Sequence, residues 1–186
     1  MKRIGFFGGC FNPPTIAHIE IAEKALKECN LDKLVFVPMG DKYLKKDLIE
    51  YEFRYDMLKL YCKYNSKFEV SDMQRNQIER TYAIDTFKQI EEQYPNSKKF
   101  YIMGIDNFSK MEKWKNYDEL ISKYNYIIFK RDNVINLNKY NNIHFIDFDS
   151  DISSTKIRTL IKTNNSVNGL LYEDVEQYIK DKGLYK

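Results

Sequence analysis

A turn rich in glycine and proline near the amino terminus carries residues suited to binding an anion. It spans Gly8 to His18 (GGCFNPPTIAH) and follows Lys2–Phe7, an apolar segment typical of a buried strand. The glycines remove side chains where a ligand would approach the backbone. A helix beginning near Thr15 would present free amides and the positive end of its dipole. Thr15 and His18 are three residues apart, so both can donate hydrogen bonds to phosphate from one helix face.

A purely structural role for this turn is the alternative. Thr15 would then only cap the helix, and His18 would be a partly buried residue of its first turn. We favour ligand binding because the paired glycines, the Phe-Asn-Pro run and the Thr-x-x-His spacing occur together directly after a strand. Cys10 lies in the same turn, but no second histidine nearby indicates an activated nucleophile, so we interpret it as an inert small residue.

A second candidate anion site lies near the carboxyl terminus. The segment DSDISSTKIR, residues 149–158, follows an expected strand and opens an expected helix. Ser154 and Thr155 can satisfy the first helical amides, and Lys156 or Arg158 adds a charge that a phosphate can use. A well-capped amphipathic helix with Arg158 on the surface is an equally good reading. Two such helix starts on one sheet favour two contacts with one polyanion, such as a nucleoside triphosphate.

The two segments match neither the Walker A loop nor the Gly-x-Gly-x-x-Gly fingerprint. We also find no Ser-His-Asp set, carboxylate dyad or Cys-His pair. A site of hydrogen-bond donors and cations without a nucleophile suits direct in-line transfer of a phosphoryl or nucleotidyl group. Alignment and charge stabilisation supply most of the rate enhancement in such reactions.

Apolar strand-like segments alternate with segments of helical periodicity along the whole chain. This pattern predicts an α/β fold with a doubly wound parallel sheet, in one domain over residues 1–186 with a C-terminal helical segment from about residue 153. Ligands of such sheets bind beyond the carboxyl ends of the strands. The expected strands are Lys2–Phe7, Leu34–Pro38, Lys67–Val70, Phe100–Met103, Tyr126–Phe129 and Ile143–Phe148; the expected helices run from about Thr15 to Asn30, over Phe53–Tyr64, from Tyr82 to Tyr94, around Ser154–Thr163 and around Tyr172–Lys182.

Composition narrows the class of protein. The chain has 186 residues, with 30 Lys and Arg against 27 Asp and Glu, so its net charge of +3 argues only weakly for nucleic acid. An RNA-binding module is therefore a remote alternative. No apolar run is long enough to cross a membrane, and three cysteines without a Cys-x-x-Cys pair argue against a disulfide framework or a zinc site. We expect a cytoplasmic protein with no metal ligated by protein alone.

The two segments together resemble the nucleotidylyltransferase superfamily that has a His/Thr-x-x-His motif. Within it the chain resembles the nicotinate-nucleotide adenylyltransferases, through ISSTKIR at 152–158, MGIDN at 103–107, Trp114, Thr81-Tyr82 and YIKDKGLY at 178–185. The resemblance implies a Rossmann-like fold. It also implies transfer of AMP from ATP to a pyridine mononucleotide in NAD biosynthesis, with release of pyrophosphate.

The resemblance also implies roles for particular residues. His18, Thr15 and Arg158 would stabilise the reacting phosphates, with His18 protonated when ligand is bound. Trp114 and Asp106 also have structural readings, as a core aromatic and a helix cap. The implied ATP-binding residues are Gly8, Gly9, Cys10, Phe11, Thr15, His18, Gly104, Asp106, Ser154, Thr155 and Arg158; those for the pyridine nucleotide are Thr81, Tyr82, Trp114 and either Lys45 or Lys46. Arg131, which follows the end of an expected strand, is a further candidate, and a surface charge is an equally good reading of it.

Several choices stay open at this point. Thr15 stands where most bacterial members of the nicotinate branch have histidine, and Ala83 replaces a hydroxyl residue near the pyridine substituent. We prefer nicotinate mononucleotide as acceptor, with nicotinamide mononucleotide, pantetheine phosphate or a non-catalytic nucleotide sensor as alternatives. Mg²⁺ is expected to bind through the ATP phosphates. Assembly into a homo-oligomer is left open.

Overall fold

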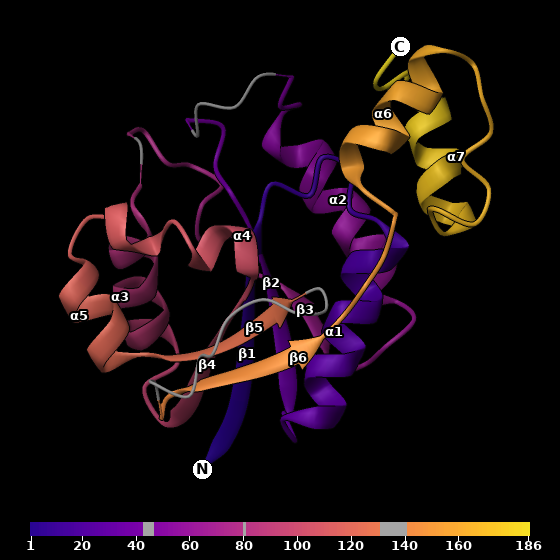
Figure 1. Cartoon of the computed structure of the whole chain (residues 1–186). Coiled ribbons are helices and arrows are strands. Elements are labelled where there is room, and N and C mark those ends of the chain that lie inside the picture. Colours follow the sequence, from indigo (N-terminus) through magenta and orange to yellow (C-terminus); the bar gives the residue numbers. More distant parts are fainter. Residues whose placement is uncertain (43–46, 80, 131–140) are drawn as a thin grey trace.

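Six parallel strands form the centre of the protein, in the order β3-β2-β1-β4-β5-β6 (Figure 1). The computed structural model describes residues 1–42, 47–79, 81–130 and 141–186. The strands are β1 (Lys2–Gly9), β2 (Lys33–Pro38), β3 (Phe68–Val70), β4 (Ser97–Gly104), β5 (Asn125–Lys130) and β6 (Ile143–Asp147). Each neighbouring pair is parallel, as the alternation of strand-like and helical segments predicts.

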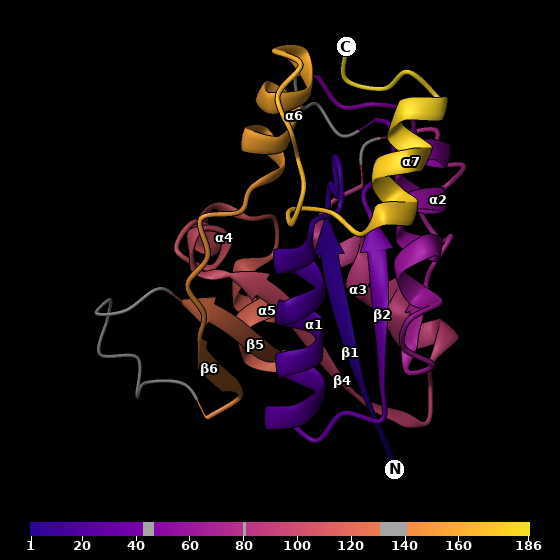
Figure 2. The same ribbon diagram turned by 90° about the vertical axis from the view of Figure 1, so that its right-hand side faces the viewer.

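Helices cover both faces of this sheet (Figures 1 and 2). They are α1 (Ile16–Glu28), α2 (Tyr51–Cys62), α3 (Ala83–Gln93), α4 (Ile105–Phe108), the 3₁₀ turn η1 (Met111–Lys113), α5 (Tyr117–Lys123), α6 (Ser154–Lys162) and α7 (Glu173–Asp181). None of the helices in the described part of the chain is long and apolar enough to span a bilayer. The expected doubly wound α/β class is therefore confirmed.

Alternation along the strands explains why two separate cores form. Successive side chains of a strand point to opposite faces, so Phe6 and Phe7 of β1 enter different clusters. Phe7 packs with apolar residues of α1, α2, α6 and α7, whereas Phe6 packs with those of α3 and α5. Both faces of the sheet are buried, which accounts for the continuous apolar runs of the strand sequences.

The order of strands reverses at the centre of the sheet. From β1 the chain proceeds outward through β2 and β3, then returns to β4 beside β1 and proceeds outward again. Gly9 and Gly104 end these two central strands at the same edge of the sheet. Open parallel sheets bind ligands in the crevice at such a reversal point.

Most predicted elements are present with shifts of a few residues, but the segment between β4 and β5 was missed. It contains α4, η1 and α5, of four, three and seven residues. Elements this short span one or two turns, so no apolar repeat can develop. The expected helix Phe53–Tyr64 instead runs from Tyr51 to Cys62, and the buried Tyr51 donates its hydroxyl to the Ser71 carbonyl at 3.0 Å.

The buried sheet predicts a large difference between two identical substitutions. Ile127 of β5 is fully buried, whereas Ile78 is 87% exposed. Ile127→Ala should lower the free energy of unfolding by about 2–5 kcal/mol, because lost burial and a residual cavity add together. Ile78→Ala should change it by less than about 0.5 kcal/mol. Urea denaturation of both variants measures the difference, and equal losses would contradict the described core.

Candidate active site

A cavity of about 770 Å³ opens at the carboxyl ends of β1 and β4. This volume lies within the range of small-molecule sites. The cavity is bordered by the turn after β1, the start of α3, the segment after β4 and the start of α6. Its described lining includes Gly8, Gly9, Cys10, Phe11, His18, Thr81, Tyr82, Gly104, Trp114 and Ser154. The structure therefore brings together ten predicted residues from four distant segments.

Glycine leaves the backbone of both central strands open at this edge. No described atom lies within 4 Å of the position that a Cβ would take at Gly8 or at Gly104. At Gly9, in contrast, a Cβ would lie 3.0 Å from the Phe11 ring. Phe11 adopts a positive φ of 48° and is 2% exposed, with its ring packed edge-on against Phe7 and Phe36. Side-chain packing thus fixes the turn in a backbone conformation that non-glycine residues rarely adopt.

Thr15 fixes the orientation and tautomer of His18. Thr15 is the N-cap of α1, and its backbone N–H donates to Nδ1 of His18 at 3.0 Å. A backbone N–H can only donate, so Nδ1 is an acceptor and the ring hydrogen belongs to Nε2. The Thr15 hydroxyl lies 2.8 Å from the same Nδ1. In this structure Nδ1 of His18 therefore accepts, which leaves Nε2 as the ring nitrogen that can donate to a ligand.

Thr15 itself is buried. Its exposed fraction is 0%, and the residue is absent from the described lining of the cavity. The capping role that we weighed as an alternative is therefore present, together with a direct contact to His18. Thr15 acts on the cavity through the histidine in this structure.

The two predicted anion-binding turns touch each other. Ser154 at the start of α6 donates from Oγ to the Pro13 carbonyl at 2.8 Å. Arg158 donates from Nη1 to the Asn12 carbonyl at 2.8 Å and from Nη2 to the Thr155 hydroxyl at 3.3 Å. Ser154 lines the cavity, whereas Thr155 and Arg158 do not. The two segments therefore converge as predicted, and two donors of Arg158 hold the turn.

Helix α2 supplies further donors to the same turn. The fully buried Arg54 donates from Nη1 to the Cys10 carbonyl at 3.0 Å, and the Tyr61 hydroxyl donates to the Pro14 carbonyl at 3.4 Å. In a planar trans peptide the C=O and the following N–H point in opposite directions. The Phe11 N–H therefore points away from Arg54. A turn whose carbonyls face protein donors can offer its amides to an anion.

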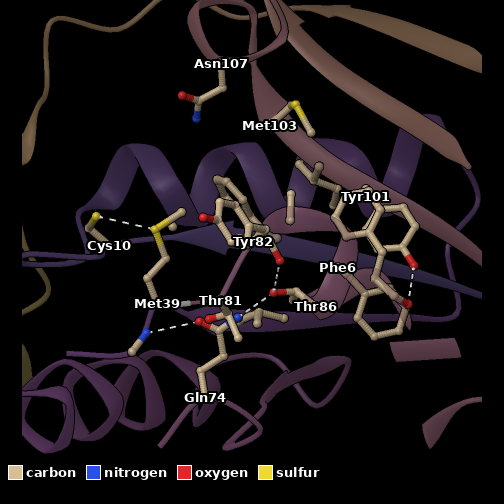
Figure 3. Close-up of a pocket in the computed structure, with 18 of the residues that line it drawn as sticks. Phe6, Cys10, Met39, Gln74, Thr81, Tyr82, Thr86, Tyr101, Met103 and Asn107 are labelled. Atoms are coloured by element: carbon tan, nitrogen blue, oxygen red, sulfur yellow. Dashed lines mark hydrogen bonds between the residues drawn. The ribbon is translucent and has the colours of Figure 1, made fainter. Parts of the chain in front are cut away.

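At the other end of the cavity, an amide side chain links three segments (Figure 3). Gln74 is 6% exposed, accepts from the Gly40 N–H at 3.1 Å and donates to the Thr86 hydroxyl at 2.7 Å. Glycine is needed at position 40, because a Cβ there would lie 2.9 Å from the backbone carbonyl oxygen of Gln74. Thr81 and Tyr82 precede α3 at this end, and Trp114 borders the same space. This end combines aromatic faces with hydrogen-bond donors.

The charges around the cavity are mainly positive. Among the described lining residues the cations are Lys42, Lys110, Lys113 and Lys115, and the carboxylate is Glu79. The Lys115 ammonium lies 4.7 Å from the centre of the Tyr82 ring, within the range of a cation–π contact. Burial raises the pKa of the Tyr101 phenol, whose hydroxyl donates to the Phe87 carbonyl at 3.3 Å and so adds no charge to the wall. Such a wall suits an anionic ligand.

The remaining predicted residues fall in two groups. Asp106, at the start of the short α4, is exposed and does not line the cavity, whereas the neighbouring Asn107 does. Lys45, Lys46 and Arg131 lie outside the described residues. Sequence analysis missed Gly40, Met39, Gln74, Asn107 and Arg54; of these, Gly40 carried a signal, since it follows the end of an expected strand.

Removal of the Thr15 hydroxyl should destabilise the protein measurably. Thr15→Ala loses the N-cap bond to α1, which is typically about 1 kcal/mol, up to about 2 kcal/mol. Thr15→Ser keeps the hydroxyl and should retain most of the free energy of unfolding. Urea denaturation compares the two variants. An equal loss in both would mean that the methyl group, not the hydroxyl, stabilises this turn.

A family model and curated relatives both match this chain over most of its length. A family model described as "Cytidylyltransferase-like" matches residues 6–160. Two curated relatives are each named "Probable nicotinate-nucleotide adenylyltransferase". The one from Clostridium acetobutylicum is 34% identical over 199 residues, with 100% of both chains covered. The one from Shouchella clausii is 32% identical over 188 residues, covering 100% of this chain and 97% of the relative.

Solved structures share the fold at lower sequence identity. Plasmodium falciparum nicotinic acid mononucleotide adenylyltransferase complexed with NaAD superposes with a TM-score of 0.87 at 23% identity, covering 100% of this chain and 98% of that one. The same Plasmodium enzyme complexed with APC gives a TM-score of 0.84 at 22% identity, with the same coverage. The arrangement of strands and helices is therefore that of a known fold.

Proposed function

The chain belongs to the cytidylyltransferase-like family and, within it, to the nicotinate-nucleotide adenylyltransferases, and from this premise we propose its reaction. It transfers the AMP moiety of ATP to nicotinate mononucleotide, which gives nicotinate adenine dinucleotide and pyrophosphate in NAD biosynthesis. The observation that best supports this proposal is one cavity bordered at one end by Gly8, His18 and Ser154 and at the other by Trp114 and Thr81. Such a cavity can hold two nucleotides with their phosphates adjacent.

The reaction needs alignment more than covalent help. An oxygen of the acceptor phosphate attacks the α-phosphorus of ATP as the bond from that phosphorus to the bridging oxygen breaks. Pyrophosphate leaves with the bonding electrons. We propose that the Phe11 N–H of the turn after β1 and the Nε2–H of His18 stabilise the charge that grows on the phosphate oxygens, with Gly8 and Gly9 leaving the backbone open to them. Because Thr15 holds the ring in place, this donor is oriented before the substrate arrives.

The start of α6 would contact the distal phosphates. Ser154 lines the cavity, and Arg158 has five N–H donors, of which one binds the Asn12 carbonyl and another the Thr155 hydroxyl. Arg158 can therefore hold the turn and approach a phosphate with its other donors. We place the adenosine beside Gly104, with Asp106 near the ribose, and regard Thr155 as a support for Arg158.

The acceptor would bind at the other end of the cavity. We propose that Trp114 stacks on the pyridine ring and that Thr81 and Tyr82 surround the ring substituent. Four lysines against one glutamate in the described wall favour a carboxylate over a neutral carboxamide, and hence nicotinate over nicotinamide. Lys45 and Lys46 remain our candidates for the acceptor phosphate, and Arg131 a further one.

Mg²⁺ would reach this site with the nucleotide. The described wall offers N–H, hydroxyl and ammonium groups, which suit phosphate oxygens, with Glu79 as its carboxylate. Magnesium prefers phosphate oxygens and water to a cage of protein ligands. We therefore propose that the phosphates hold the ion, which would offset their negative charge.

Release of pyrophosphate identifies the acceptor. With ATP and Mg²⁺, nicotinate mononucleotide should give the highest kcat/KM, ahead of nicotinamide mononucleotide and pantetheine phosphate, because the lysines attract its carboxylate. Omission of the acceptor or addition of EDTA should abolish the signal. ATP binding without pyrophosphate release from any acceptor would indicate a nucleotide sensor, and preference for nicotinamide mononucleotide would contradict the acceptor assignment alone.

His18→Ala should lower kcat by about 10²- to 10³-fold, the usual cost of losing one preorganised donor. His18→Gln should recover part of this loss, because its amide can accept from the Thr15 N–H and still donate. His144→Ala, at the exposed histidine of β6, is the matched control and should leave kcat unchanged. If the glutamine variant were as slow as the alanine variant, a neutral donor would not be the function of His18.

A further inference from the structure

Asn12, in the turn after β1, joins segments from three parts of the chain. Its side chain is 1% exposed. Oδ1 accepts from the Tyr185 hydroxyl at 2.9 Å and from the Ile49 N–H at 3.4 Å, and Nδ2 donates to the Asp47 carbonyl at 2.7 Å. The phenol of Tyr185 is thus hydrogen-bonded to the turn after β1, 173 residues away in sequence.

Tyr185 is held firmly in this position. Its exposed fraction is 8%, and its ring belongs to the same apolar cluster as Phe11 and Ile157. The preceding Leu184 donates its N–H to the Ile179 carbonyl of α7 at 3.0 Å, which ties the last residues to that helix. Burial raises the pKa of the Tyr185 phenol, so its oxygen carries a hydrogen at physiological pH and donates to Asn12.

The residues bonded to Asn12 are linked to one wall of the cavity through Arg54. Met39, Gly40 and Lys42 line the cavity after β2, and Asp47 and Ile49 follow them in the sequence beyond residues 43–46, which lie outside the described part of the chain. Arg54 provides a second link between this wall and the turn. Besides the Cys10 carbonyl, it binds the Asp41 carboxylate and the Ile49 carbonyl, each at 2.9 Å.

The two links differ in strength. Arg54 makes three bonds, one of them to a carboxylate, in the fixed fork of a guanidinium. Asn12 depends on an outside donor, since without the Tyr185 hydroxyl its Oδ1 retains only the 3.4 Å bond from Ile49. Its carboxamide would then have an under-satisfied buried oxygen and more freedom to rotate. The bond to the Asp47 carbonyl would lose its fixed direction.

We propose that Tyr185 is a positioning residue for adenylyl transfer, acting through Asn12. By fixing the Asn12 side chain it sets the wall formed after β2 against the turn that faces the ATP phosphates, and so the distance between the two reacting groups. This inference rests on the proposed function. Tyr185 touches neither nucleotide in it, so its loss changes the rate of transfer more than the binding of either substrate.

Tyr185→Phe tests the proposal because it removes one hydroxyl and keeps the buried ring. We expect kcat to fall about tenfold, less than the roughly hundredfold that a misplacement of about 1 Å can cause, with both KM values within about twofold. Tyr178→Phe is the matched control. The Tyr178 hydroxyl links α7 to α2 through Asp56 at 2.8 Å, away from the turn, so its removal should leave kcat unchanged.

A double-mutant cycle with Asn12→Ala tests the route. If Tyr185 acts through Asn12, Tyr185→Phe should have no further effect on kcat in the Asn12→Ala background. Thermal unfolding of each variant confirms that the assays compare folded proteins. Should Asn12→Ala not fold, the comparison of Tyr185→Phe with Tyr178→Phe decides alone.

Three results would overturn the inference: an unchanged kcat in Tyr185→Phe, an equal loss in Tyr178→Phe, or a Tyr185→Phe loss of the same size in the Asn12→Ala background. The first two would make the hydroxyl dispensable or merely structural, and the third would remove Asn12 from the route. A wild-type protein that releases no pyrophosphate would instead overturn the proposed function, so the two failures can be told apart.

Discussion

The structure depends on how the turn between β1 and α1 satisfies its carbonyl groups. Those of Cys10, Asn12, Pro13 and Pro14 accept from side chains of α2 and α6. A buried carbonyl without a donor would cost free energy comparable to a lost hydrogen bond, so these partners are required. Because the donors approach from the protein side, the Phe11 amide points the other way. The need to pair the carbonyls of this turn with donors thus explains why α2 and α6 contact it.

Much of this arrangement is polar and buried, which makes it specific rather than simply stabilising. Arg54 is fully buried, and its carboxylate partner Asp41 is half exposed. Removing one member of such a network leaves its partners unsatisfied, whereas an intact network fixes one geometry. The apolar clusters on the two faces of the sheet give the fold most of its stability. The polar network then determines how the edge of the sheet is shaped for phosphates.

Prediction from the sequence succeeded where the signal was local and repeated. Short runs such as Leu34–Pro38, rich in valine and phenylalanine, favour a buried strand, and the apolar repeat after Pro14 extends over several turns of helix. It failed for α4, η1 and α5, whose short lengths allow no periodicity. Thr15 shows an intermediate case. Its position before a helix predicts a cap. The bond from its N–H to Nδ1 of His18, which fixes the tautomer, is seen only in the tertiary structure.

By itself the sequence determined the α/β class and the sheet edge at which ligands of such folds bind, and it marked the Gly8–His18 and Ser154–Arg158 segments as candidate anion sites. Those features follow from residue type and short-range spacing, which can be read directly from the sequence. Only the tertiary structure decided that Arg158 faces the Asn12 carbonyl, that Gln74 links Gly40 with Thr86, and that Tyr185 donates to Asn12. These partners are 12 to 173 residues apart, and the packing of whole helices on the sheet sets which donor meets which acceptor.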